Sequence, residues 1–103
     1  MYYALRMIRS IAGSATRRFV ETGKSRFSGM DAEVARRRIA QLNAATSLQS
    51  FGRLNSVGLH KLTGDLKGFW SIDINGPWRL LFRFRDGDAY EVHIVDTHAK
   101  RRS

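Results

Sequence analysis

Three runs of alternating apolar and polar residues in the second half of the chain constrain its fold most strongly. The runs occupy residues 70–74, 79–84 and 90–95, and each places apolar side chains at every second position. Because neighbouring side chains of a β-strand point to opposite faces, each run has one face to bury. Residues 59–62 indicate a further strand entering the same sheet. Short turns separate the last three strands, so the pattern predicts an antiparallel meander with one buried face.

The turns at residues 75–77 and 86–88 set the register. A two-residue loop at Asn75-Gly76 would place Ile72 opposite Arg79 and mix the two faces, whereas three-residue loops keep the apolar face continuous. The pairs that follow from three-residue loops are Ile74–Trp78, Ile72–Leu80, Asp73–Arg79, Phe82–Val92 and Arg83–Glu91. Opposite charges then face each other across the strands. Trp70 and Trp78 fall on the inward face, so we assign them to the core rather than to base stacking.

The first half of the chain predicts two helices. Ser14 is a candidate N-cap and Gly23 a natural stop for a helix over residues 14–22. A longer helix should begin near Ser28 or Asp31 and run to about Ala45. Its apolar stripe consists of Ala35, Ile39 and Leu42. Residues 7–11 are expected to form a short strand and residues 47–57 a loop.

Early helices followed by a late meander predict an α+β domain, with two N-terminal helices packed on one face of a small, mainly antiparallel sheet. We expect residues 1–103 to form a single domain. Residues 1–6 precede a second methionine and are a candidate extension, and residues 99–103 are a basic tail that either contacts RNA or is disordered. The opposite sheet face is predicted to be polar and mainly cationic, with Ser71, Asp73, Arg79, Arg83, Arg85, Glu91 and His93.

Charge indicates the class of partner. The sequence has 18 Lys and Arg against 9 Asp and Glu, a net charge of +9. Such a balance favours a polyanion: nucleic acid, an anionic membrane surface or an acidic protein. Fourteen of the 18 cations are arginine, whose planar guanidinium suits phosphate recognition.

Several classes of protein are disfavoured. There is no cysteine, so disulfides and thiolate metal sites are not available. No apolar run approaches the length of a membrane span, and the N-terminus lacks the pattern of a secretion signal. We therefore expect a cytoplasmic protein that does not bind membranes. The three histidines lack close ligand spacing and no nucleotide-binding motif occurs, so we expect neither a metal nor a cofactor.

The remaining candidates flank the cationic sheet face. His60, Lys61 and Lys67 precede it and residues 96–98 follow it. Metal-free RNA cleavage needs a group that takes the proton of a 2′-hydroxyl, cations that stabilise the phosphorane, and a group that protonates the 5′-oxygen. Histidine or a carboxylate can move the protons, and arginine and lysine can stabilise the charge.

The order of these segments resembles the HigB-type toxins of the RelE superfamily. The resemblance is carried by residues 58–72 (GLHKLTGDLKGFWSI), residues 74–80 (INGPWRL) and the ending EVHIVDTH at residues 91–98. It implies a ribosome-dependent messenger-RNA endonuclease that acts by 2′-hydroxyl attack. The partners implied are messenger RNA, ribosomal RNA and a HigA-like helix-turn-helix antitoxin.

The resemblance also assigns residues. Arg79 matches the sheet arginine that contacts the scissile phosphate, and Asp96 and His98 match the outer members of an Asp-Tyr-His ending. Thr97 stands where tyrosine is usual, so the base stacking or proton transfer of that tyrosine is in question. The predicted catalytic residues are Arg79, Asp96, His98 and His60. The predicted RNA- and phosphate-binding residues are Lys61, Lys67, Arg83, Arg85 and Thr97.

Simpler roles compete with these assignments. Arg79 and Asp73 form a surface ion pair in one reading, and Asp96 caps a turn. His93 makes only a cross-strand contact with Leu81. A solvated helix face also explains the cluster at residues 36–38 better than RNA contact does.

Two other functions stay open. A toxin of the related ParE branch shares the fold but poisons DNA gyrase by protein binding, and fold alone does not separate the two. A non-catalytic RNA-binding module, or a degenerate toxin in which Thr97 marks lost activity, is the third possibility.

Overall fold

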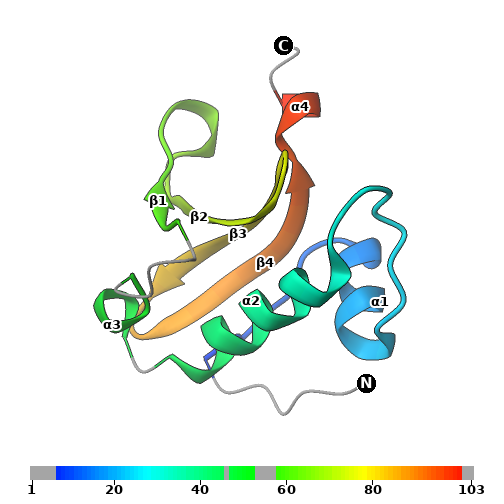
Figure 1. Ribbon diagram of the computed structural model, residues 1–103. Coiled ribbons are helices and arrows are strands. Elements are labelled where there is room, and N and C mark those ends of the chain that lie inside the picture. The colour runs from blue at the N-terminus through cyan, green and yellow to red at the C-terminus, as the bar shows by residue number, and fades with distance from the viewer. Residues whose placement is uncertain (1–6, 46, 53–57, 101–103) are drawn as a thin grey trace.

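Four antiparallel strands form a meander in the computed structural model, which describes residues 7–45, 47–52 and 58–100. The strands are β1 (His60–Lys61), β2 (Phe69–Asn75), β3 (Trp78–Arg85) and β4 (Asp88–Asp96), in the order β1-β2-β3-β4. The helices are α1 (Ser14–Thr22), α2 (Ala32–Ala44), α3 (Leu48–Gly52), the 3-10 turn η1 (Gly64–Leu66) and α4 (Thr97–Lys100). The predicted α+β class is confirmed (Figure 1). The expectations for residues 1–6, 53–57 and 101–103, and for the side chain of Lys100, lie outside the described part.

Local signals explain the ends of the two main helices. Gly23 ends α1 in the left-handed conformation (φ 80°), and its N–H donates to the carbonyl of Phe19 at 2.8 Å. The predicted cap at Ser14 is wrong by one residue, because Gly13 holds that position and supplies no side-chain cap. Asp31 caps α2, its carboxylate accepting from the N–H of Val34 at 3.1 Å.

Both helices cover the same face of the sheet (Figure 1). Helix α2 packs on β2 and β3, and α1 packs on β4. The predicted stripe of α2 is confirmed, since its three residues are at most 1% exposed. They meet inward side chains of the strands, among them Ile72, Leu80, Phe82 and Val92. Trp70 and Trp78 are half-buried against this core, as predicted.

Two expectations for the segments outside the sheet are wrong. Residues 7–11 form isolated parallel bridges, Ile8–Ala89 and Ile11–Val92, rather than a strand. The reason is that β4 is irregular between these two partners, so a continuous ladder cannot form. The expected loop at 47–57 contains α3, which a tertiary contact stabilises: Phe51 is 2% exposed and lies edge-on to Phe82, with centroids 6.4 Å apart.

The β2–β3 pairing is as predicted in its centre, where two of the predicted pairs occur, Ile72–Leu80 and Asp73–Arg79. Near the turn, the predicted partner of Trp78 is wrong, because Asn75 pairs with it instead of Ile74. A bulge between residues 73 and 75 absorbs one residue, so the connection is the two-residue turn Gly76-Pro77.

The β3–β4 pairing differs more. Arg85 pairs with Asp88, so this turn also has two residues instead of three. The predicted pair Arg83–Glu91 is wrong, because Arg83 pairs with Tyr90; beyond a register shift the predicted register holds, and Leu81 pairs with His93.

The bulge behind this shift lies at Glu91, whose φ is 52°. Two residues of β4, Glu91 and Val92, therefore lie opposite Phe82 alone. As a result Tyr90, predicted to point inward, shares the outer face with Arg83, and Ala89 occupies the core in its place with 0% exposure.

Candidate active site

The sheet face opposite α1 and α2, called the open face below, brings together four of the nine predicted site residues: Arg79, Arg83, Arg85 and His60. Partners in an antiparallel ladder share a face. One row across the sheet consists of His60, Ser71, Leu81 and His93, and the next of Asp73, Arg79 and Val95. Figure 1 shows the β1–β2 connection and α4 rising on this side, away from α2. Ser71 and Leu81 are buried, at 5% and 2% exposed, and form the floor between the charged side chains.

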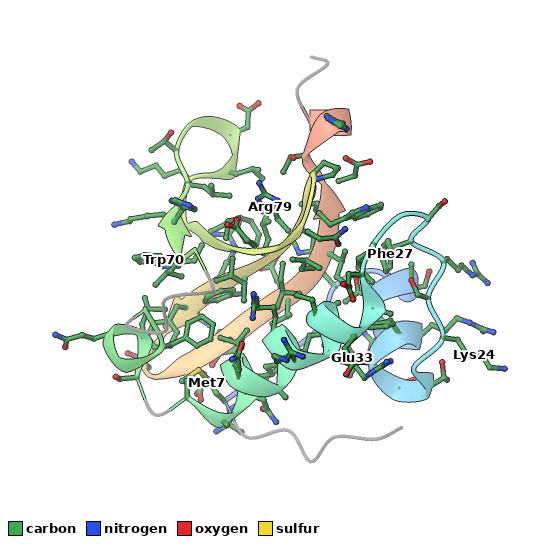
Figure 2. All side chains as sticks on the ribbon, viewed as in Figure 1. Met7, Lys24, Phe27, Glu33, Trp70 and Arg79 are labelled. Carbon is green, nitrogen blue, oxygen red and sulfur yellow. The ribbon has the colours of Figure 1, made fainter. Side chains whose placement is uncertain are left out.

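Arg79 is held in one orientation by its neighbours. Its Nε lies 3.0 Å from Oδ1 of Asp73, and its Nη1 donates to the carbonyls of Gly76 at 2.6 Å and Trp78 at 2.9 Å. Within the described residues, Nη2 has no protein partner. The side chain is 28% exposed and lies between the β1–β2 connection and α4 in the view of Figure 2. A preoriented guanidinium with a free N–H edge suits a phosphate oxygen.

The end of β4 lies beside the β2–β3 turn, because Asp96 pairs with Trp78. This pairing puts Asp96 on the face of Trp78, whereas Val95 shares the open face with Arg79. Asp96 Oδ1 accepts from the backbone N–H of His98 at 2.9 Å, so Asp96 does cap the turn into α4. The same oxygen is 3.9 Å from Nδ1 of His98, whose side chain is 72% exposed, so the carboxylate keeps the imidazole at the end of β4.

Thr97 is occupied by backbone contacts. Its N–H and its hydroxyl both donate to the carbonyl of Pro77, each at 2.8 Å. Threonine has no aromatic ring to stack on a base, and its hydroxyl is already bonded to this carbonyl. Thr97 instead joins the end of β4 to the β2–β3 turn.

Of the two predicted lysines, Lys61 lies away from these residues. His60 pairs with Ser71 and faces the open side, but Lys61 pairs with Trp70 on the opposite face. Its Nζ lies 5.7 Å from the centre of the Trp70 ring. Lys67 follows η1 in the β1–β2 connection and is exposed.

Arg83 and Arg85 lie on the open face farther along β3. The guanidinium of Arg83 stacks over Phe69 at 4.1 Å and forms an ion pair with Glu91 at 3.2 Å. That of Arg85 lies 4.7 Å from the centre of the Tyr90 ring. Exposed pairs of this kind are worth about 0–1 kcal/mol, so an RNA phosphate can exchange with Glu91 at little cost.

A second buried group on the open face was not predicted. Phe69 is 8% exposed beneath Arg83, and the His93 ring meets it edge-on with centroids 5.6 Å apart. Nδ1 of His93 lies 2.8 Å from the carbonyl oxygen of Glu91. Alternation alone had placed His93 on this face, but no sequence signal indicates the bulge at Glu91 that provides this carbonyl.

Arg38, assigned by the sequence to a solvated helix face, is buried at 7% exposure. Its Nε donates to the carbonyl of Asp73 at 2.8 Å and its Nη1 to Gln41 at 3.2 Å. The cation therefore supports, from behind the sheet, the residue that holds Arg79.

The described residues contain no group of three His, Cys, Asp or Glu side chains able to hold a metal ion. None of the helices in the described ranges has the length and apolar character needed to cross a membrane.

The chain is similar to known proteins over the same segments that form this site. A family model described as the RelE-like toxin of type II toxin–antitoxin system HigB matches residues 10–98. The chain is also 35% identical over 94 residues to Endoribonuclease HigB of Proteus vulgaris, an alignment that covers 89% of this chain and 100% of that protein.

Proposed function

Because the chain belongs to the HigB-like family of RelE-like toxins from type II toxin–antitoxin systems, we propose that it is an endoribonuclease that cleaves messenger RNA on the ribosome. We propose further that a HigA-like helix-turn-helix antitoxin neutralises it and that it acts in the cytoplasm, where its substrate is translated. The endoribonuclease activity follows from the relative in Proteus vulgaris. The net charge of +9 supports a polyanionic substrate.

The observation that carries this proposal is the fixed guanidinium of Arg79 beside the Asp96–His98 turn. Three contacts hold Nε and Nη1, while the pairing of Trp78 with Asp96 brings the acid and the imidazole to the same edge of the sheet. A scissile phosphate on Nη2 of Arg79 would therefore lie at the end of the sheet where β4 supplies Asp96 and His98, two groups able to move protons.

Cleavage by this set is a transfer of phosphorus between two oxygens. The 2′-oxygen attacks the adjacent phosphorus as its proton is removed, and the bond from phosphorus to the 5′-oxygen breaks as that oxygen gains a proton. The products are a 2′,3′-cyclic phosphate and a 5′-hydroxyl. Arg79 stabilises the added negative charge, with Arg83 and Arg85 holding neighbouring phosphates. His98, Asp96 and His60 are the candidates for proton transfer, and Lys67 and Thr97 are candidates for RNA contact. Lys61, on the other face of the sheet, is not part of this proposed path.

Induced expression tests this function. We expect the wild-type chain to stop growth and to yield cleaved transcripts, and Arg79→Ala or His98→Ala to remove both effects. Arg26→Ala is a matched control, since it also removes one exposed arginine but lies in the α1–α2 connection. Co-expression of a helix-turn-helix protein encoded beside the gene should restore growth.

Two results would contradict the proposal. Transcripts that stay intact during growth arrest would show that the chain does not act as a nuclease. Stabilised gyrase–DNA cleavage complexes formed by the purified protein would instead indicate a poison of the ParE type.

A further inference from the structure

Glu91 interrupts β4 in a conformation that strands rarely contain. Its φ of 52° is one of two positive values among the non-glycine residues described, and the other, Asp86, lies in a turn. Bulges of this kind re-aim neighbouring groups and recur beside active sites. At this bulge Glu91 makes three contacts. Its N–H donates to the hydroxyl of Ser10 at 2.8 Å, its carboxylate forms an ion pair with Arg83, and its carbonyl oxygen lies within hydrogen-bond distance of His93 Nδ1.

The contact with His93 fixes the tautomer of the ring. A carbonyl oxygen can only accept, so at 2.8 Å the Nδ1 of His93 must carry the hydrogen. In the neutral imidazole the lone pair is then on Nε2. The edge-on contact with Phe69 fixes the plane of the ring.

His93 lies between two arginines of the open face. Its cross-strand partner is Leu81, and Arg79 is a diagonal neighbour because Arg79 pairs with Val95. Such diagonals span about 7–8 Å, within reach of long side chains. On its other side, His93 shares the Phe69 ring with the guanidinium of Arg83. An RNA strand with its scissile phosphate on Arg79 and a neighbouring phosphate on Arg83 would pass next to the imidazole.

The rings of the other two histidines are not oriented in this way. His60 is exposed on a two-residue strand. His98 is 72% exposed, and its Nδ1 is 3.9 Å from Asp96. All three histidines are within the described residues, and only the ring of His93 is oriented by a hydrogen bond.

We propose that His93 is a catalytic residue of the nuclease, with Nε2 taking the proton of the attacking 2′-hydroxyl. This inference rests on the proposed function. As the 2′-oxygen bonds to phosphorus, its proton passes to Nε2, and the carbonyl of Glu91 stabilises the resulting imidazolium through Nδ1. The bond to the 5′-oxygen breaks as His98 supplies a proton to that oxygen. Product release returns one proton from His93 to solvent and one to His98.

The variant His93→Asn separates catalysis from structure. The amide nitrogen of Asn occupies the place of Nδ1 and still donates to Glu91, but nothing replaces Nε2. We expect single-turnover cleavage of ribosome-bound messenger RNA to fall by about 10²–10⁴-fold, the usual contribution of a general base. Binding of a substrate with a 2′-deoxynucleotide at the cleavage site should stay within about twofold. In His93→Ala, added imidazole should restore part of the rate.

A measurement on the wild-type protein avoids dependence on any variant. Nitrogen-15 NMR of the neutral ring should show the proton on Nδ1 of His93. A proton on Nε2, or cleavage by His93→Asn within about threefold of wild type, would overturn the assignment. If the wild-type protein binds ribosomes but cleaves no RNA, the proposed function fails together with this one, whereas an active wild type with a fully active His93→Asn removes His93 alone.

Discussion

The backbone N–H and the hydroxyl of Thr97 both donate to one acceptor, the carbonyl oxygen of Pro77, each at 2.8 Å. This double contact joins the end of β4 to the β2–β3 turn. The residues on either side of Pro77, Gly76 and Trp78, provide the two carbonyls that hold Arg79. The C-terminal end of the sheet thus takes part in orienting the arginine proposed to bind the phosphate.

Removing the hydroxyl of Thr97 should loosen this turn. Thr97→Val keeps the shape but loses one hydrogen bond, so we expect the free energy of unfolding to fall by about 0.5–1.5 kcal/mol and RNA cleavage to slow. Thr97→Ser, which keeps the hydroxyl, is the matched control and should cleave close to the wild-type rate. Urea denaturation and a cleavage assay measure the two effects, and equal rates for both variants would contradict the positioning role.

Neutralising Asp73 should separate binding from cleavage. The ion pair with Arg79 is partly exposed and is worth about 0–1 kcal/mol. The free energy of unfolding of Asp73→Asn should therefore lie within about 1 kcal/mol of the wild-type value. The variant gains one positive charge and should bind RNA at least as tightly. Because Nε of Arg79 loses its carboxylate, cleavage of the bound RNA should slow. A single-turnover rate equal to that of the wild type would show that Asp73 does not orient Arg79.

Gly58 approaches Asp73 closely. A Cβ at Gly58 would clash with Oδ2 of Asp73 and would push the carboxylate away from Arg79. Gly58→Ala also carries the cost of its φ of 58°, about 1–2 kcal/mol. Gly87→Ala has a comparable φ cost but enters open space in the other turn. We expect both variants to be destabilised, measured by thermal unfolding, and only Gly58→Ala to lose nuclease activity beyond its loss of folded protein.

The buried cation behind the sheet should matter for stability. Arg38→Met leaves the carbonyl of Asp73 without its side-chain donor, so we expect a loss of about 1–3 kcal/mol in the free energy of unfolding. The exposed neighbour in the same helix gives the control: Arg37→Met should change stability by at most about 0.5 kcal/mol. Equal effects in urea denaturation would mean that burial of Arg38 contributes nothing.

The sequence was sufficient for the three long strands and the two main helices but not for the irregularities of the sheet. Period-two alternation predicted the strands, and the stripe at Ala35, Ile39 and Leu42 predicted α2, because burial of one face imposes those periods. A three-residue loop, and a two-residue turn followed by a bulge, give the same register farther along the strands and so fit the same alternation there. The two registers differ only between the turn and the bulge, where Ala89 lies inward in place of the predicted Tyr90.

The sequence likewise predicted some features of the site and missed others. Cross-strand pairing predicted that Asp73 and Arg79 meet, and they do. Lys61 was grouped with His60 because they are adjacent in sequence, yet adjacent strand residues face opposite sides. The buried state of Arg38 depends on contacts with residues 35 positions away, which helix periodicity does not reveal.

The bridging of residues 8 and 11 to β4 has a consequence for the order in which this toxin comes into being. The backbone of Met7 and Arg9 bonds to Ala89, and that of Ser10 and Ala12 bonds to Val92. The described residues that are synthesised first therefore complete these hydrogen bonds only after some of those that are synthesised last. At roughly 5–20 residues per second, translation separates them by several seconds. We expect nascent chains stalled before Val92 to stay sensitive to protease, because these hydrogen bonds cannot form until Ala89 and Val92 are present.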